Sequence, residues 1–333
     1  MTLLIHAPPA SAAKTDVIVL ANGDRITCEV KTLSRGQLQV KTDDIGTLSV
    51  EWDKVATVNT AGQFDIALRD GRRLVGAFVA APAGQAGIGI VSTDGTMMTV
   101  PFLDLVSFAP IRAGFFEKID GSLDLGASYT QSSGIGQFSF STNESYRRPS
   151  FEASVSFAST LTQDADSTDS ALYALNVGFK KFHANRWVTT PFVLIEHNPD
   201  LGFDLRSTAA IALARFVVQS NRTEVLLGGG AAIGRELPTG ESATTNVDAL
   251  IALSASFYTY DYPKTSFDLS VLVFPSLSDS GRVRINANLK LKRELFKDFH
   301  VGLTGYDSFD NRPPVTDVSE NDVGFSLSLG WTF

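Results

Sequence analysis

The sequence predicts an all-β protein in which a small N-terminal β domain precedes an antiparallel transmembrane β-barrel of about twelve strands. Near the C-terminus, apolar residues alternate with small polar residues, which is the two-residue period of a strand with two different faces. Candidate strands recur along residues 113–333, with connections that are alternately short and long. A hairpin pattern occurs twice within residues 14–112. No stretch approaches the roughly 18 consecutive apolar residues that a transmembrane helix needs.

Residues 1–13 are interpreted as the remaining end of a secretory signal peptide. Their sequence, MTLLIHAPPASAA, has a short apolar region followed by small residues at the spacing of a cleavage site. The basic start of such a signal is missing, so a disordered N-terminus is the alternative. Export is therefore the expectation, with the N-terminal domain in the periplasm of a Gram-negative bacterium.

Residues 14–112 contain an internal duplication. Val17–Val30 resembles Asp65–Phe78, about 48 residues later, and each segment has a turn pair, Asn22-Gly23 or Asp70-Gly71, between alternating apolar residues. This pattern predicts one β-hairpin in each unit. The later segments VEWDKV and VPFLDL also match. The units resemble small SH3-like or Sm-like barrels. A protein or peptidoglycan contact and a spacer role without a ligand both remain open, because a fold alone does not give a function.

The last strand is apolar on one face only. In a soluble sheet such a face packs on a core, whereas in an outer-membrane barrel it faces lipid and the polar face lines the lumen. The same residues resemble the C-terminal signal that the barrel-assembly machinery reads, although Gly330 lies two residues later than the usual glycine. We therefore expect outer-membrane lipid, lipopolysaccharide and the assembly machinery as partners. The residues of this signal are Phe325, Leu327, Leu329, Trp331 and Phe333.

Alternation also predicts which charged side chains face the lumen. A charge on the lipid face near mid-bilayer costs about 2–4 kcal/mol. Glu152, Asp248 and Arg284 each lie between apolar neighbours, so they are expected to point inward. Lys290 and Lys292 are further pore-lining candidates, and with Arg293 they form either a basic constriction or a set of interfacial side chains. Candidate strands fall at 121–131, 136–147, 150–161, 171–181, 187–196, 205–218, 223–235, 246–260, 265–275, 282–294, 299–307 and 322–333.

The connections predict the orientation of the barrel. Short periplasmic turns opposite longer outer loops are typical of bacterial barrels, and this arrangement places both barrel ends in the periplasm. Acidic residues gather in the long connections, where Asp164, Asp166 and Asp169 are candidates for a divalent cation site, since hard oxygen ligands suit Ca²⁺. A solvated loop surface is the alternative. The acidic residues at this end are Asp164, Asp166, Asp169, Asp200, Glu241, Asp279, Asp310, Asp317, Glu320 and Asp322.

No motif predicts catalysis or a cofactor. The net charge of −8 argues against nucleic-acid binding, because phosphate binding needs clustered Lys and Arg. Cys28, the single cysteine, falls in a predicted strand and is expected to be buried. His197, beside Glu196, is the only histidine near the predicted outer loops, and no G-x-S-x-G elbow occurs. Gly228–Gly230 lies within a strand pattern, which predicts close strand packing and not a phosphate loop.

The C-terminal part resembles a known family. The segment KLKRELFKDFHVGLTGYDSFDNRPP, residues 290–314, and the ending GFSLSLGWTF are similar to the YdiY-like salt-induced outer-membrane proteins, whose function is unknown. The segments NGDRITCEV and VEWDKV resemble the module often found before that barrel. The resemblance implies an outer-membrane barrel and brings no catalytic residues. A structural or envelope-adaptation role with a narrow or filled lumen, a passive porin-like channel for small solutes or ions, and more remotely a lipid-modifying enzyme remain as hypotheses.

Overall fold

The computed structural model of the chain confirms the all-β prediction. It describes residues 14–111, 119–130, 135–148, 150–163, 170–199, 202–296, 299–313 and 320–331. Strands and short 3₁₀ turns make up the regular structure of these residues, and none of their helices is long and apolar enough to cross a bilayer. The chain forms two compact units, one up to Ile66 and over Leu74–Pro110, and the other over Ala67–Arg73 and Ile111–Phe333. Residues 1–13, the predicted signal remnant, lie outside the described residues.

The first unit repeats one series of elements, four strands followed by a 3₁₀ turn and a fifth strand, in the order expected from the duplicated sequence. The first series is β1 (Asp16–Leu20), β2 (Arg25–Ser34), β3 (Gln37–Lys41), β4 (Thr47–Glu51), η1 (Trp52–Lys54) and β5 (Val55–Asn59). The second is β6 (Phe64–Leu68), β7 (Arg73–Val79), β8 (Ile88–Ser92), β9 (Met97–Val100), η2 (Phe102–Asp104) and β10 (Leu105–Pro110). The likeness to SH3-like or Sm-like barrels stays a prediction.

Both predicted hairpins are present, and the two series share a sheet and a core. Gly23 and Gly71 take positive φ angles of 94° and 88°, which glycine tolerates at a tight turn. The strand order is β4-β3-β2-β10-β6-β7-β8-β9, so β10 of the second series lies beside β2 of the first. Trp52 Nε1 donates a hydrogen bond of 2.8 Å to the Phe102 carbonyl oxygen, and its ring meets Phe108 edge-on at 5.9 Å. Cys28 is buried in this core.

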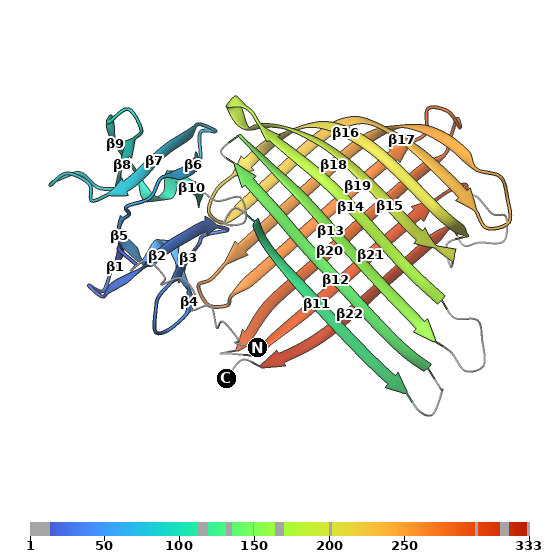
Figure 1. Cartoon of the computed structure of the whole chain (residues 1–333), viewed down its shortest axis with the longest axis horizontal. Coiled ribbons are helices and arrows are strands. Elements are labelled where there is room, and N and C mark those ends of the chain that lie inside the picture. Colours follow the sequence, from blue (N-terminus) through green and yellow to red (C-terminus); the bar gives the residue numbers. More distant parts are fainter. Residues whose placement is uncertain are drawn as a thin grey trace, which may run out of the picture. The chain divides into compact units, whose positions relative to one another are not determined.

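The second unit is a curved antiparallel sheet of twelve strands, in which each strand pairs with the next along the chain (Figure 1). The strand number is the one predicted, and the predicted strand ends differ from the observed ones by a few residues at most. Hydrogen bonds between the two edge strands, β11 and β22, are absent among the described residues. The strands are β11 (Ile119–Thr130), β12 (Ile135–Arg148), β13 (Phe151–Gln163), β14 (Ser170–Phe182), β15 (Trp187–Asn198), β16 (Phe203–Gln219), β17 (Thr223–Pro238), β18 (Thr244–Thr259), β19 (Thr265–Pro275), β20 (Val283–Phe296), β21 (Phe299–Asp310) and β22 (Asn321–Trp331).

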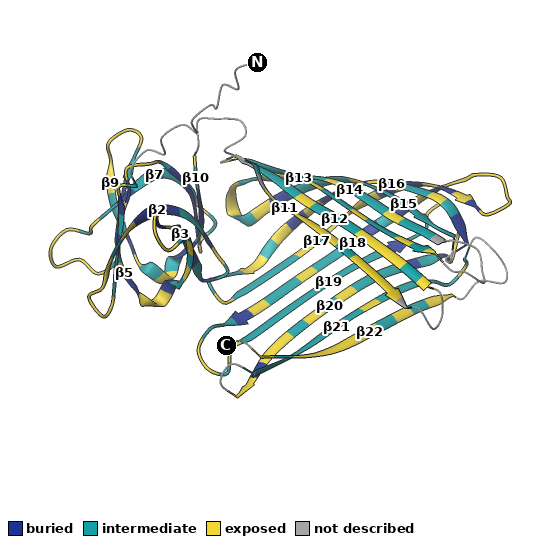
Figure 2. Cartoon of the chain, turned by 60° about the horizontal axis from the view of Figure 1, so that its bottom comes forward, coloured by how far each residue is buried: buried dark blue, intermediate teal, exposed yellow. Residues whose placement is uncertain are grey.

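The two faces of this sheet have opposite composition. Ala210 and Ala212 on β16 are buried, while their neighbours Ile211 and Leu213 are about half exposed. Buried and exposed positions alternate in the same way over residues 231–238 of β17 and 246–251 of β18 (Figure 2). We call the face that carries Ala210 the inner face and the face that carries Ile211 the outer face. Side chains that a soluble sheet would cover are therefore exposed on the outer face, up to 82% for Phe325.

Candidate functional site

A network of charged side chains is buried on the inner face, near the end of the sheet where the longer connections lie. Glu236 on β17 is 1% exposed and has three arginine neighbours. Its carboxylate oxygens lie 3.0 Å from Arg206 Nε, 3.0 Å from an Arg282 amino group and 3.4 Å from an Arg284 amino group. The contact with Arg206 is an ion pair without a hydrogen bond, because the Nε–H does not point at the oxygen.

Two further carboxylates balance these arginines. Asp248 on β18 accepts a hydrogen bond of 2.6 Å from Arg284, and Asp310 at the end of β21 accepts one of 2.6 Å from Arg282. The network thus pairs three cations with three anions, which is the condition under which charges can remain buried. Glu196 on β15 lies directly across from Arg206 in the strand register and adds a fourth acidic group at this level.

The network reaches across the inner face and does not follow one strand pair. Glu236 and Arg284 belong to β17 and β20, which have two strands between them. In a flat sheet, strands with two others between them stand about 14 Å apart, since neighbouring strands are about 4.8 Å apart. The curvature of the sheet and the length of both side chains bring the charged atoms together. The ion pairs therefore tie distant strands to one another across the concave side.

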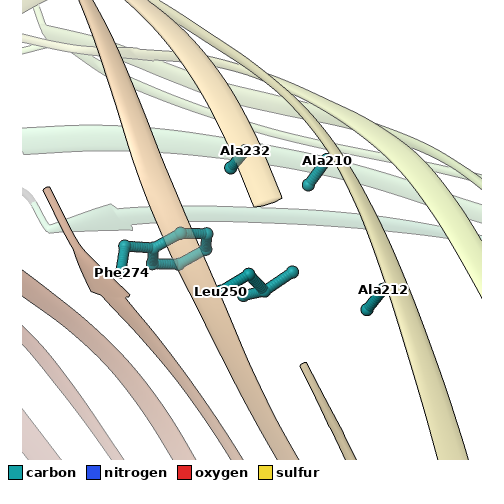
Figure 3. Close-up of a cluster of buried hydrophobic side chains, with 5 residues drawn as sticks. All are labelled: Ala210, Ala212, Ala232, Leu250 and Phe274. Atoms are coloured by element: carbon teal, nitrogen blue, oxygen red, sulfur yellow. The ribbon is translucent and has the colours of Figure 1, made fainter. Parts of the chain in front are cut away.

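Apolar side chains fill the inner face beside the network. Ala210, Ala212, Ala232, Leu250 and Phe274 come from four consecutive strands and form one buried cluster, which Figure 3 shows gathered in a single region. The Arg284 guanidinium lies 5.2 Å from the centre of the Phe274 ring and so joins the cluster to the network. Together the two sets of side chains occupy the inner face over β16–β20.

Close approach of β16 and β17 makes this packing possible. A Cβ atom added to Gly230 would overlap the Ile211 carbonyl oxygen and lie 2.7 Å from Ala212 Cα. A Cβ on Gly229, whose side faces the other way, would meet nothing closer than 3.5 Å. The interpretation of Gly228–Gly230 as a close-packing segment agrees with this geometry.

Of the predicted lumen residues, the structure brings Asp248 and Arg284 into direct contact and places the others elsewhere on the same face. Glu152 pairs with Lys180 of the neighbouring strand at 3.1 Å. Lys290 and Lys292 occupy the same alternate positions of β20 as Arg284 and therefore lie on the inner face, but they are exposed. Arg293 lies on the opposite face, so the hypothesis that it joins the two lysines in one constriction is wrong.

Two acidic residues at the long-loop end of the sheet form ion pairs with arginines. Asp310 is engaged by Arg282, and Asp279 accepts a hydrogen bond of 2.9 Å from Arg312. The hypothesis of a solvated loop surface is therefore wrong for Asp310, whose side chain is 15% exposed, whereas the Asp279 pair lies at the surface. The candidate cation ligands Asp164, Asp166 and Asp169 lie outside the described residues, as do Asp200 and Asp317.

The histidine considered for catalysis does not meet its acidic neighbour. His197 stacks on the exposed ring of Tyr173 with centroids 4.6 Å apart, and its Nδ1 contacts the Asp204 carbonyl oxygen. Glu196 lies across from Arg206 on the inner face. Because successive strand residues point to opposite faces, Glu196 cannot orient the His197 ring.

Aromatic rings gather on the outer face near the short connections. Phe296 and Phe299 stack with centroids 4.6 Å apart, and Trp331 meets each of them edge-on at 6.1 Å. Phe151 and Phe179 stack at 5.1 Å at the same end of the sheet. Of the predicted assembly signal, Phe325, Leu327, Leu329 and Trp331 are all exposed on this face, while Phe333 lies outside the described residues.

Comparison with known protein families places the sheet within one of them. The model of the family described as protein of unknown function, DUF481, matches residues 124–333. The chain belongs to this family. The DUF481 region begins within β11 and contains the ion network, the apolar cluster, Lys290 and Lys292. The family description assigns no role to any of them. No curated protein and no solved structure matches the chain.

Arg206, Glu236 and Arg282 are functional candidates that sequence reasoning missed. Glu236 lies an even number of positions from Ala232 and Gly234 and so points to the same face of β17, and Arg206 points to the same face of β16 as Ala210. The signal was therefore a charge at an inward position of a strand, as for Asp248 and Arg284. Arg282 stands at the first position of the predicted strand 282–294, two residues before Arg284, so it carried the same signal, although it precedes the observed β20.

Proposed function

We propose that the DUF481 region closes into an outer-membrane β-barrel whose lumen is filled by side chains, and that the protein has a structural or envelope-adaptation role without enzymatic activity. The observation that carries the proposal is the inverted sheet. Its outer face exposes Ile211, Ile251 and Phe325, while charged groups are buried on its inner face. This polarity suits a lipid exterior and a polar interior.

The aromatic rings of the outer face support the same location. Outer-membrane barrels carry aromatic girdles at the two membrane interfaces. Phe296, Phe299 and Trp331 form such a group at one end of the sheet, and the exposed Tyr129 and Tyr173 lie near the other end.

The ion network and the apolar cluster support a filled lumen. A twelve-stranded barrel is small enough for its side chains to obstruct the interior. Glu236, Arg284 and Phe274 come from three strands and meet on the inner face, where ions would have to pass. The network would then act as a plug at the long-loop end.

Single-channel recording tests the filled lumen. Purified, refolded protein is added to planar bilayers, and insertion is checked separately by protection of the sheet from protease. The filled barrel predicts inserted protein that gives no steady current steps. Steady, ion-selective steps from inserted protein would overturn it.

Cross-linking tests closure. In a Cys28→Ser background, one cysteine is placed in β11 at Asp124, Gly126 or Ser128, and a second is placed in β22 at Ser326 or Ser328. The side chains at all of these positions point to the inner face. A closed barrel predicts that at least one pair forms a disulfide within the monomer. If none of the pairs does so while the protein is folded, β11 and β22 are not neighbours.

A passive channel is the second candidate, because part of the inner face is polar and uncrowded. Ser154 and Ser156 on β13 and Ser326 and Ser328 on β22 are accessible, and Lys290 is exposed. Anion-selective steps that lose selectivity in Lys290→Gln would support this candidate.

For the first unit we propose a periplasmic location and a contact with an envelope protein or peptidoglycan, which a pull-down with purified peptidoglycan would test.

A further inference from the structure

A second set of charged side chains lies at the opposite end of the inner face, near the short connections. An open cavity of about 250 Å³ lies there over β18–β21 and is lined by Tyr260, Lys264, Ser266, Lys292, Glu294 and His300. Ser266 and Lys292 are register partners on β19 and β20, and Glu294 and His300 are partners on β20 and β21. The four side chains therefore share one face.

The lysines of this cavity differ from the arginines of the network. Each of the three network arginines has a carboxylate oxygen at 3.0 Å or closer. Neither Lys264 nor Lys292 forms an ion pair or side-chain hydrogen bond with any residue that the structure describes. Their ammonium groups have three donors each and no acceptor, and they lie beside the cavity without a direct carboxylate partner.

Glu294 organises the cavity and offsets one of its two positive charges without forming an ion pair with either lysine. Its side chain is buried, and its Oε2 accepts a hydrogen bond of 3.2 Å from the backbone N–H of Lys264. The Glu294 backbone N–H in turn donates to the Lys264 carbonyl oxygen at 2.8 Å. These two bonds fix the connection that carries Lys264 against β20. The cavity thus has two cationic groups and one carboxylate, which leaves an excess of one positive charge.

We propose that this cavity binds a small anion that carries a phosphate or carboxylate group. The lysines supply charge-assisted hydrogen bonds, and Ser266 supplies a hydroxyl group. The volume is below the roughly 300–1,000 Å³ of pockets for drug-sized ligands, and so suits a free phosphate, a short carboxylic acid or a lipid phosphate headgroup. The proposal depends on four paired strands and does not rest on the membrane location proposed above.

Calorimetric titration of the full chain in a neutral detergent tests the site. The probes are inorganic phosphate and a short-chain phosphatidic acid. Saturable binding of phosphate assigns a free solute, and binding of phosphatidic acid alone assigns a lipid headgroup. Lys264→Gln and Lys292→Gln are each expected to raise Kd about tenfold or more, since each removes a charged hydrogen-bond donor.

Two matched variants keep the test specific. Arg293→Gln removes a charge from the neighbouring position on the other face of β20 and is expected to bind as the wild type does. Lys292→Arg keeps the charge and is expected to keep most of the affinity. The absence of saturable binding of either probe to the folded wild type would overturn the proposal. An equal loss in Arg293→Gln would also overturn it, because the effect would then come from overall charge.

Discussion

Replacing Glu236 with glutamine tests whether the buried network holds the sheet together. Glu236 is 1% exposed and is the shared partner of Arg206, Arg282 and Arg284. Glutamine keeps the shape of the side chain but removes the negative charge. Arg282 and Arg284 would keep their ion pairs with Asp310 and Asp248, but Arg206 would lose its only ion pair with a described residue and keep just Glu196 as an acidic neighbour across the strand register. Breaking a buried ion pair by removing one partner costs about 3–5 kcal/mol. We expect the free energy of unfolding of the Glu236→Gln variant to fall by at least about 3 kcal/mol, the lower end of this range.

Urea unfolding in detergent, followed by tryptophan fluorescence, measures the loss. Glu241→Gln is the control, because Glu241 is exposed near the same end of the sheet and is expected to change the free energy by less than about 0.5 kcal/mol. Combining Glu236→Gln with Arg206→Gln removes one cation from the unbalanced network, so the double variant should lose less than the sum of the single losses. A loss below about 1 kcal/mol in Glu236→Gln would refute the reasoning.

Three other substitutions and treatments probe packing, lipid exposure and the first unit. Gly230→Ala is expected to destabilise the sheet by about 1–3 kcal/mol, because the added Cβ overlaps β16, while Gly229→Ala, which has room, serves as its control in the same urea assay. Ile211→Lys should lower the stability of protein in phospholipid vesicles by about 2–4 kcal/mol, whereas Ser156→Lys on the inner face should cost less; equal losses would contradict the assignment of the faces. Burial, aided by the charges of Asp16 and Glu29, raises the pKa of the Cys28 thiol to about 11, so a thiol reagent at pH 8 should label the protein only after unfolding.

Periodicity made most of the architecture predictable. A two-residue period fixes both the strand and its faces, so one alternating segment such as residues 323–331 predicts β22 together with the side that is exposed. The hairpins at Gly23 and Gly71 were predictable because only a few residue pairs suit such turns. Alternation equally placed Asp248 and Arg284 on one face, where the structure pairs them at 2.6 Å.

Partner choice within the site was not predictable, because it depends on curvature. The local pattern shows that Glu236 points inward but not that it meets Arg284, which is 48 positions away and lies beyond two intervening strands. Arg282 stands at the start of the predicted strand 282–294, but nothing in the local pattern shows that it meets Glu236 and Asp310. Asp310 was predicted to lie on a solvated loop surface, because its partner Arg282 is 28 positions away in the sequence and the local pattern does not reveal it.

The two ends of the inner face differ in how their charge is balanced, and this difference constrains the function. Buried ion pairs contribute little net stability compared with apolar side chains of similar size, so the network is better explained by the strands it links than by energy alone. If the sheet closes, the network obstructs one end of the lumen, and Lys264 and Lys292 lie at the other end. An anion could then enter and bind without crossing. Saturable anion binding by a protein that inserts but carries no current is therefore the combination expected of a filled barrel, whereas an anion channel would show binding and current together, both weakened by Lys292→Gln.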